Sequence, residues 1–133
     1  MREILFRGKT DKGEWVEGYY VCLNGKEHRI YTGYAEIDCG SYYPDFYEVI
    51  PETIGQYTGL TDKNGNKIFE GDIVKHRSYY SDNIVISVVT YTDGQFLAMV
   101  DENSGFNLSD KLEIIGNIHD KPEVLKGGEQ NAR

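Results

Sequence analysis

The sequence has little positive charge and few cysteines, and each shortage removes a class of protein. Its 133 residues include 14 Lys and Arg against 22 Asp and Glu, which gives a net charge of −8. A protein that neutralises nucleic-acid phosphates needs a basic patch or stripe, so this balance argues against nucleic acid as a partner. The two cysteines, Cys22 and Cys39, are too few for the disulfide framework of a small secreted domain.

Long apolar segments are also missing. The longest uninterrupted apolar run, Tyr19 to Leu23, is five residues long, whereas a membrane span needs about 20. The residues after Met1 contain no apolar stretch of the kind found in a signal peptide. The sequence therefore predicts a soluble, cytoplasmic protein with no membrane partner.

Signals for short β-strands are abundant. The chain has 15 glycines, which suit tight turns, and 11 tyrosines, which suit a half-buried pleated surface. Only Pro51-Glu52 predicts a single helical turn. The fold class is predicted to be mainly β, or α+β at most. Strands are expected at 3–7, 15–23, 28–34, 73–75, 84–91, 95–100 and 112–118, with turns at Asn24-Gly25, Asn64-Gly65 and Thr92-Asp93-Gly94.

Residues 84–91 are largely apolar at both alternating sets of positions. Burial on two sides is typical of such a strand, and a small closed barrel provides it. Closing about five short antiparallel strands on themselves also removes exposed sheet edges. The second half of the chain is therefore predicted to form a small barrel.

Two runs, PETIGQYTGLTDKNG at 51–65 and IFEGDIV at 68–74, resemble the signature of the YopX-like proteins of phages and prophages. Residues 2–9, 13–18 and 112–119 are similar to the two ends of that family, so the resemblance extends from residue 2 to about residue 125. It implies an N-terminal mixed, mostly β subdomain followed by an SH3-like barrel, in a bacterial host cell. It also implies large homo-oligomers, and it implies no activity. The expected domains are 1–66, the barrel 67–122 and a flexible tail 123–133.

The turn that follows Thr61 has part of the pattern of a calcium-binding loop. Asp62, Asn64 and Asn66 are spaced like the first ligands of an EF-hand calcium loop. That loop needs Gly at its sixth position and Glu at its twelfth, and here Lys67 and Ile73 occupy them. A hairpin turn is therefore the favoured interpretation.

Other reactive side chains are scattered. His28, His76 and His119 lack the paired spacing of zinc ligands, and Cys22 is expected to be a core thiol. Asp45 and Glu48 lack the lysine of a metal-dependent nuclease motif. No catalytic, cofactor-binding or metal-ligating residue is predicted, and no cofactor. The alternative from another class is a metal-assisted hydrolase that uses scattered carboxylates, Asp45, Glu48 and Asp72.

The clearest candidate for function is an aromatic and acidic segment. Tyr42, Tyr43, Phe46 and Tyr47 lie within six residues, and tyrosine is enriched at protein interfaces. They are predicted to contact another copy of the chain or a basic host protein, so the protein is expected to be a non-enzymatic homo-oligomer. The alternative for the segment is a loop that folds its tyrosines onto its own core. A third function, nucleic-acid binding by the barrel, requires one shared face for a set of basic residues, Lys63, Lys67, Lys75 and Arg77.

Overall fold

The computed structural model describes residues 3–38, 40–78 and 81–121, with the backbone alone for 35–38. These residues form β-strands joined by turns and contain no helix. The predicted all-β character is thus confirmed, within the part of the chain that is described. The strands are β1 (Phe6–Lys9), β2 (Trp15–Leu23), β3 (Glu27–Asp38), β4 (Ser41–Glu48), β5 (Ile50–Thr61), β6 (Lys67–Phe69), β7 (Asp72–Arg77), β8 (Ile84–Thr92), β9 (Gln95–Met99), β10 (Gly105–Asn107) and β11 (Glu113–Asn117).

The helical turn predicted at Pro51-Glu52 is wrong, because these residues lie near the start of β5. That end of β5 pairs with β1, where Lys9 lies opposite Ile50 and Arg7 opposite Gly55. The pairing requires an extended backbone, which proline tolerates at the beginning of a strand.

Backbone contacts divide the chain into two units, Met1–Tyr57 and Thr58–Arg133, and β5 runs from the first into the second. The domain boundary predicted after residue 66 stays a prediction. The tail predicted at 123–133 lies outside the described residues.

The first unit is an antiparallel sheet in the order β4-β3-β2-β1-β5, and the sheet continues to β6 in the second unit. The predicted turn at Asn24-Gly25 is confirmed, since both residues have positive φ, 55° and 68°, as a type I′ turn requires. Ile30 and Val49 are buried, and a Cβ placed on Gly8 would lie within about 3.1 Å of both. Glycine at this position therefore allows the strands to approach closely.

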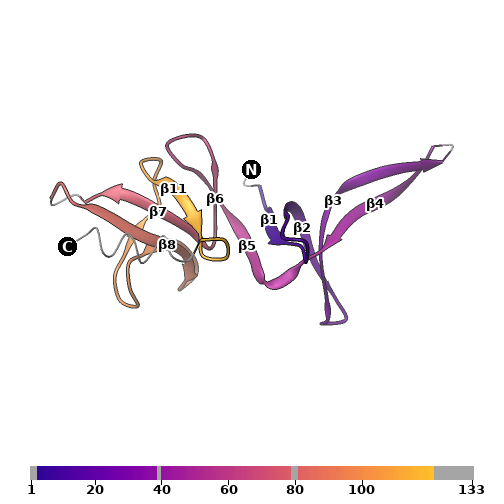
Figure 1. Ribbon diagram of the computed structural model, residues 1–133, viewed down its shortest axis with the longest axis horizontal. Coiled ribbons are helices and arrows are strands. Elements are labelled where there is room, and N and C mark those ends of the chain that lie inside the picture. The colour runs from indigo at the N-terminus through magenta and orange to yellow at the C-terminus, as the bar shows by residue number, and fades with distance from the viewer. Residues whose placement is uncertain (1–2, 39, 79–80, 122–133) are drawn as a thin grey trace. The chain divides into compact units, whose positions relative to one another are not determined.

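The second unit is a five-stranded antiparallel sheet in the order β10-β9-β8-β7-β11, as Figure 1 shows in part. Its core consists of one cluster of buried side chains, Ile68, Val74, Val89, Ala98 and Leu112. Among the described residues this sheet is open, with β10 and β11 at its edges, so the predicted closure is not observed. The burial of β8 agrees with this: Ser87 and Val89 are buried on one face, whereas no residue of the other face, which carries Ile84, is fully buried.

No helix among the described residues has the length and apolar character needed to cross a membrane.

Candidate functional site

The hairpin formed by β3 and β4 is the most exposed element of the first unit. Pairing between β2 and β3 ends at Tyr19 and Tyr31, whereas pairing between β3 and β4 continues to Asp38 and Ser41. The outer half of the hairpin is therefore a ribbon of two strands, which extends away from β1 and β2 in Figure 1. Every residue of β4 is exposed to solvent.

The strand register divides the four predicted contact residues between the two faces of this ribbon. Side chains alternate along a strand, so Tyr42 and Phe46 lie on one face and Tyr43 and Tyr47 on the other. Directly paired residues share a face, which places Tyr34, opposite Pro44, with Tyr42 and Phe46. The four residues, which are close in the sequence, thus form two pairs on opposite faces of the ribbon. Only the pair Tyr42 and Phe46 shares its face with aromatic residues of β3.

The face that carries Tyr42 and Phe46 continues onto β2. Tyr19 lies opposite Tyr31, and Tyr31 lies opposite Phe46, so these three residues form one row across three strands. Tyr19, Tyr34 and Tyr42 are 67%, 76% and 63% exposed. The row and the ribbon together form a continuous exposed patch, called the aromatic face below and defined by Tyr19, Tyr31, Tyr34, Tyr42 and Phe46.

The opposite face of the same strands belongs partly to the core of the unit. There Ile30 lies between Tyr20 and Tyr47 in the row and is fully buried. Tyr20 packs on Phe6, with ring centroids 5.6 Å apart, and its hydroxyl lies 2.7 Å from Nδ1 of His28. Burial, together with the nearby Cys22 thiol, raises the pKa of Tyr20 above its ordinary value, so the phenol stays neutral. The opposite face is thus covered at Ile30, whereas no described residue of the aromatic face is fully buried.

An arginine organises the base of the aromatic face. The guanidinium of Arg29 lies 4.2 Å from the ring centre of Phe46 and donates to the hydroxyl of Tyr31 at 3.3 Å. It also forms an ion pair with Glu27 at 2.8 Å. The hydrogen bond with Tyr31 raises the pKa of Arg29, so the cation persists at any physiological pH. Tyr31 and Phe46, whose rings are 5.3 Å apart, are thereby fixed in position before any partner binds.

The carboxylates of the hydrolase alternative do not form a site within either unit. Asp45 and Glu48 are an odd number of residues apart on β4 and so lie on opposite faces. In the second unit, Asp72 is buried and its Oδ2 accepts a hydrogen bond from the backbone N–H of Phe69 at 2.8 Å. Within the described ranges, no group of three or more His, Cys, Asp or Glu side chains could hold a metal ion.

In the turn that resembles the start of a calcium loop, the carboxylate of Asp62 binds backbone N–H groups. Oδ1 of Asp62 accepts from the N–H groups of Asn64 and Asn66, both at 2.9 Å, and Oδ2 accepts from Ile114 at 3.1 Å. Burial alone would raise the pKa of Asp62, but these three backbone donors stabilise the carboxylate and lower it. Both oxygens are engaged within the protein, which agrees with the interpretation as a turn.

The structure describes one of the two cysteines, Cys22. Cys22 was expected in the core and that expectation is wrong, because it is exposed and forms no disulfide. It follows Val21 on β2 toward the Asn24-Gly25 turn, beyond the buried part of the sheet. Cys39 lies outside the described residues.

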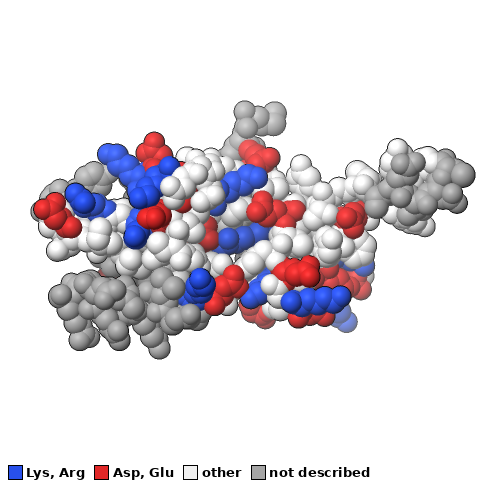
Figure 2. Space-filling model, turned by 45° about the horizontal axis from the view of Figure 1, so that its top comes forward, with Lys and Arg blue, Asp and Glu red and all other residues white. Residues whose placement is uncertain are grey.

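The basic residues of the nucleic-acid alternative are partly neutralised. Lys63 and Lys75 converge on one carboxylate, Glu113, and both Nζ atoms lie 3.4 Å from its Oε1. On the face drawn in Figure 2, basic and acidic side chains are interspersed and form no broad stripe of one sign. This arrangement does not favour a phosphate-tracking groove.

The comparisons with known proteins agree with the fold. The family model described as YopX protein matches residues 5–126 of the 133. The chain belongs to the YopX family. A solved structure of this kind, described as protein EF1440 from Enterococcus faecalis, is 27% identical, with a TM-score of 0.63 over 94% of this chain and 99% of that chain. No curated protein matches the chain. The family and the solved structure indicate common ancestry, and neither name specifies an activity.

Three members of the aromatic face, Tyr19, Tyr31 and Tyr34, are not among the residues that the sequence predicts as contacts. Tyr19 is 23 residues from Tyr42 in the sequence, and only the register of β2, β3 and β4 brings these residues onto one face. The alternation of apolar residues could have suggested a shared face within each strand, but not between strands.

Proposed function

We propose that this member of the YopX family is a non-enzymatic module that assembles with further copies of itself through the aromatic face. The observation that carries the proposal is the gathering on one face of β2, β3 and β4 of four exposed aromatic side chains, Tyr19, Tyr34, Tyr42 and Phe46, around the half-buried Tyr31. Soluble monomers rarely expose contiguous apolar surface of this kind, and such patches mark interaction sites. A cytoplasmic location, a phage or prophage origin and an SH3-like architecture for the second unit are parts of the same proposal.

The chemistry of the face suits protein contact. A tyrosine buries a large apolar ring while its hydroxyl remains able to bond with water or with a partner. A second copy can supply rings for offset or edge-to-face packing against the first, each pair contributing about 0.5–1.5 kcal/mol beyond the area buried. The fixed positions of Tyr31 and Phe46 around Arg29 reduce the entropy that binding must overcome.

Contact through the face is favoured over strand addition at the free edge of β4. Pro44 lies in the middle of β4 and has no N–H to give to an added strand. Proline on an edge strand is one of the devices that prevent edge-to-edge pairing. Assembly is therefore proposed to stack faces rather than to extend the sheet.

The test is solution mass by light scattering over a hundredfold concentration range. The parent chain is expected to increase in mass with concentration. The triple variant Tyr34→Ser, Tyr42→Ser, Phe46→Ser is expected to weaken association at least tenfold while keeping its circular dichroism, because these side chains are exposed.

Tyr43→Ser is the matched control, since Tyr43 is 60% exposed, neighbours Tyr42 and lies on the opposite face. Equal loss of association in the control and the triple variant would remove the aromatic face from the proposal. If the chain is a monomer at every concentration and binds a basic host protein through the same residues, self-assembly is ruled out. The aromatic face is then a binding site for a host protein.

A further inference from the structure

A cleft in the second unit is lined by a half-buried histidine, His76, whose two ring nitrogens have no hydrogen-bond partner among the described residues. The cleft measures about 510 Å³ and lies between the end of β7, the strand β10 and the segment that leads into β11. Neither ring nitrogen of His76 has a hydrogen-bond partner among the described residues, although both are shielded from solvent. A buried polar group left unpaired is costly and is rare in folded proteins, so this one calls for an explanation.

The position of His76 follows from the fold. His76 alternates with Val74, a core residue, and lies opposite Val85 of β8, so its ring is directed to the edge of the core. The ring meets Phe106 edge-on, with centroids 4.7 Å apart. Gly105 makes this contact possible, because a Cβ there would lie 2.5 Å from Sδ of Met99 and would push β10 away from β9.

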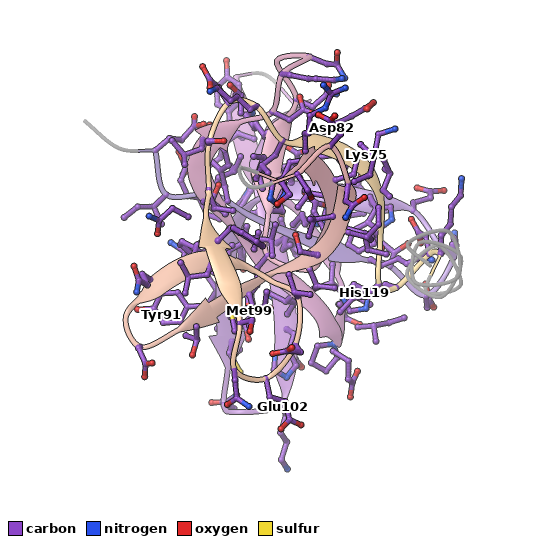
Figure 3. All side chains as sticks on the ribbon, turned by 90° about the vertical axis from the view of Figure 1, so that its left-hand side faces the viewer. Lys75, Asp82, Tyr91, Met99, Glu102 and His119 are labelled. Carbon is purple, nitrogen blue, oxygen red and sulfur yellow. The ribbon has the colours of Figure 1, made fainter. Side chains whose placement is uncertain are left out.

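The lining of the cleft has one sign of charge. Among the described residues, the lining includes Arg77 and Lys111 and no Asp or Glu, and its neutral polar groups come from Ser78, Asn107 and Ser109. The nearest acidic group on β11, Glu113, is engaged with Lys63 and Lys75. In the view of Figure 3, Lys75 and Asp82 are labelled toward one end of this unit and Met99 and Glu102 toward the other. The lining is thus locally cationic within a chain of net charge −8.

We infer that this cleft binds a small phosphate monoester that carries a flat apolar group. Two cations match the two charges of a phosphate monoester, and arginine forms paired hydrogen bonds with phosphate oxygens. The ring of Phe106, which lines the cleft, provides an apolar surface for the flat group. Binding is expected to turn the imidazole of His76, so that one of its shielded nitrogens gains the partner that it lacks. The volume falls within the range of about 300–1,000 Å³ found for small-molecule sites. This site is independent of the aromatic face, which lies wholly in the first unit.

The test is a nuclear magnetic resonance titration of the full chain with phenyl phosphate. Saturable shifts are expected for the ring of His76 and for Phe106, and none of similar size for His28. Burial lowers the pKa of free His76, and a bound anion is expected to raise it. Inorganic phosphate is expected to compete weakly, and phenol is not expected to bind.

Variants of the cleft and of a control position distinguish a specific binding site from non-specific electrostatic attraction. Arg77→Gln with Lys111→Gln is expected to weaken binding at least tenfold, whereas Lys26→Gln, an exposed cation in the first unit, should leave it unchanged. His76→Phe is expected to fold more stably without ligand and to bind several-fold more weakly. Absence of a shift at His76, or equal losses in the cleft and control variants, would overturn the inference. A single-stranded oligonucleotide that binds a hundredfold more tightly, with a steep salt dependence, would also overturn it and assign the cleft to nucleic acid.

Discussion

Replacing Asp62 tests how one buried carboxylate holds the second unit together. Asp62 is only 3% exposed and accepts backbone hydrogen bonds from Asn64, Asn66 and Ile114. In Asp62→Asn the remaining oxygen can still accept from Asn64 and Asn66, but the new amide group directs its own donors at the N–H of Ile114. One charge-assisted hydrogen bond is lost and a donor is left unpaired, which costs about 2–3 kcal/mol.

The matched control is Asp101→Asn. Asp101 caps a similar turn, in which Oδ1 accepts from the backbone N–H groups of Asn103 and Ser104, both at 2.8 Å. Unlike Asp62, it is exposed, and both of these bonds are local. Asparagine can keep both bonds, so the expected cost is about 0.5 kcal/mol or less. Urea unfolding followed by circular dichroism measures both variants. Equal costs at the two positions would refute the role given to the Ile114 contact.

The same pair of variants gives a pH dependence whose sign follows from the lowered pKa of Asp62 in the folded state. Its stabilising contribution is fully present above the ordinary carboxyl pKa and is lost as the pH falls through the lowered folded value. The stability difference between the parent chain and Asp62→Asn is therefore expected to shrink on acidification below about pH 4. A difference that stays constant to pH 2 would contradict this.

Four further substitutions probe packing, a turn and the sheet edge. Gly18→Ala places a Cβ against the carbonyl oxygen of Tyr31 and should lower the free energy of unfolding by about 3 kcal/mol or prevent folding. At Gly25 a Cβ meets nothing within 4 Å, but φ is +68°, so Gly25→Ala should lower it by about 1 kcal/mol; urea unfolding measures both. Ser87→Ala should stabilise the protein by about 1 kcal/mol, because the buried hydroxyl has no partner among the described residues; a measured loss would reveal one. Pro44→Val adds an N–H to β4 and should increase β-sheet aggregation, measured by thioflavin fluorescence; an unchanged rate would mean that this edge is protected by something else.

Assembly through the aromatic face and ligand binding in the cleft involve different units and can be tested separately. The triple variant of the face keeps every lining residue of the cleft, and the cleft variants keep Tyr19, Tyr34 and Tyr42. A result against one proposal therefore leaves the other standing.

The candidate site could be predicted in part. The density of Tyr42, Tyr43, Phe46 and Tyr47 in six residues is a local property, so the sequence alone pointed to this segment. It could not divide the four residues between two faces with Tyr34 on one of them, because that division depends on which residue of β3 lies opposite each residue of β4. A shift of one position in the register would reverse the faces.

The features that the sequence predicts correctly are local ones. They are the succession of short strands and the turns at Asn24-Gly25 and Asp93-Gly94, whose positive φ values only a few residue types tolerate. In agreement with the short apolar runs, no helix among the described residues could cross a membrane. The tertiary structure decided the rest. Pairing with β1 overrode the helical signal of Pro51, and the apolar residues on both faces of 84–91 did not produce a closed barrel, because only one face of β8 has fully buried residues. It also placed His76 beside Phe106, 30 residues away in the sequence. These outcomes depend on contacts between distant strands, and the free energy of such contacts is not encoded in any local pattern.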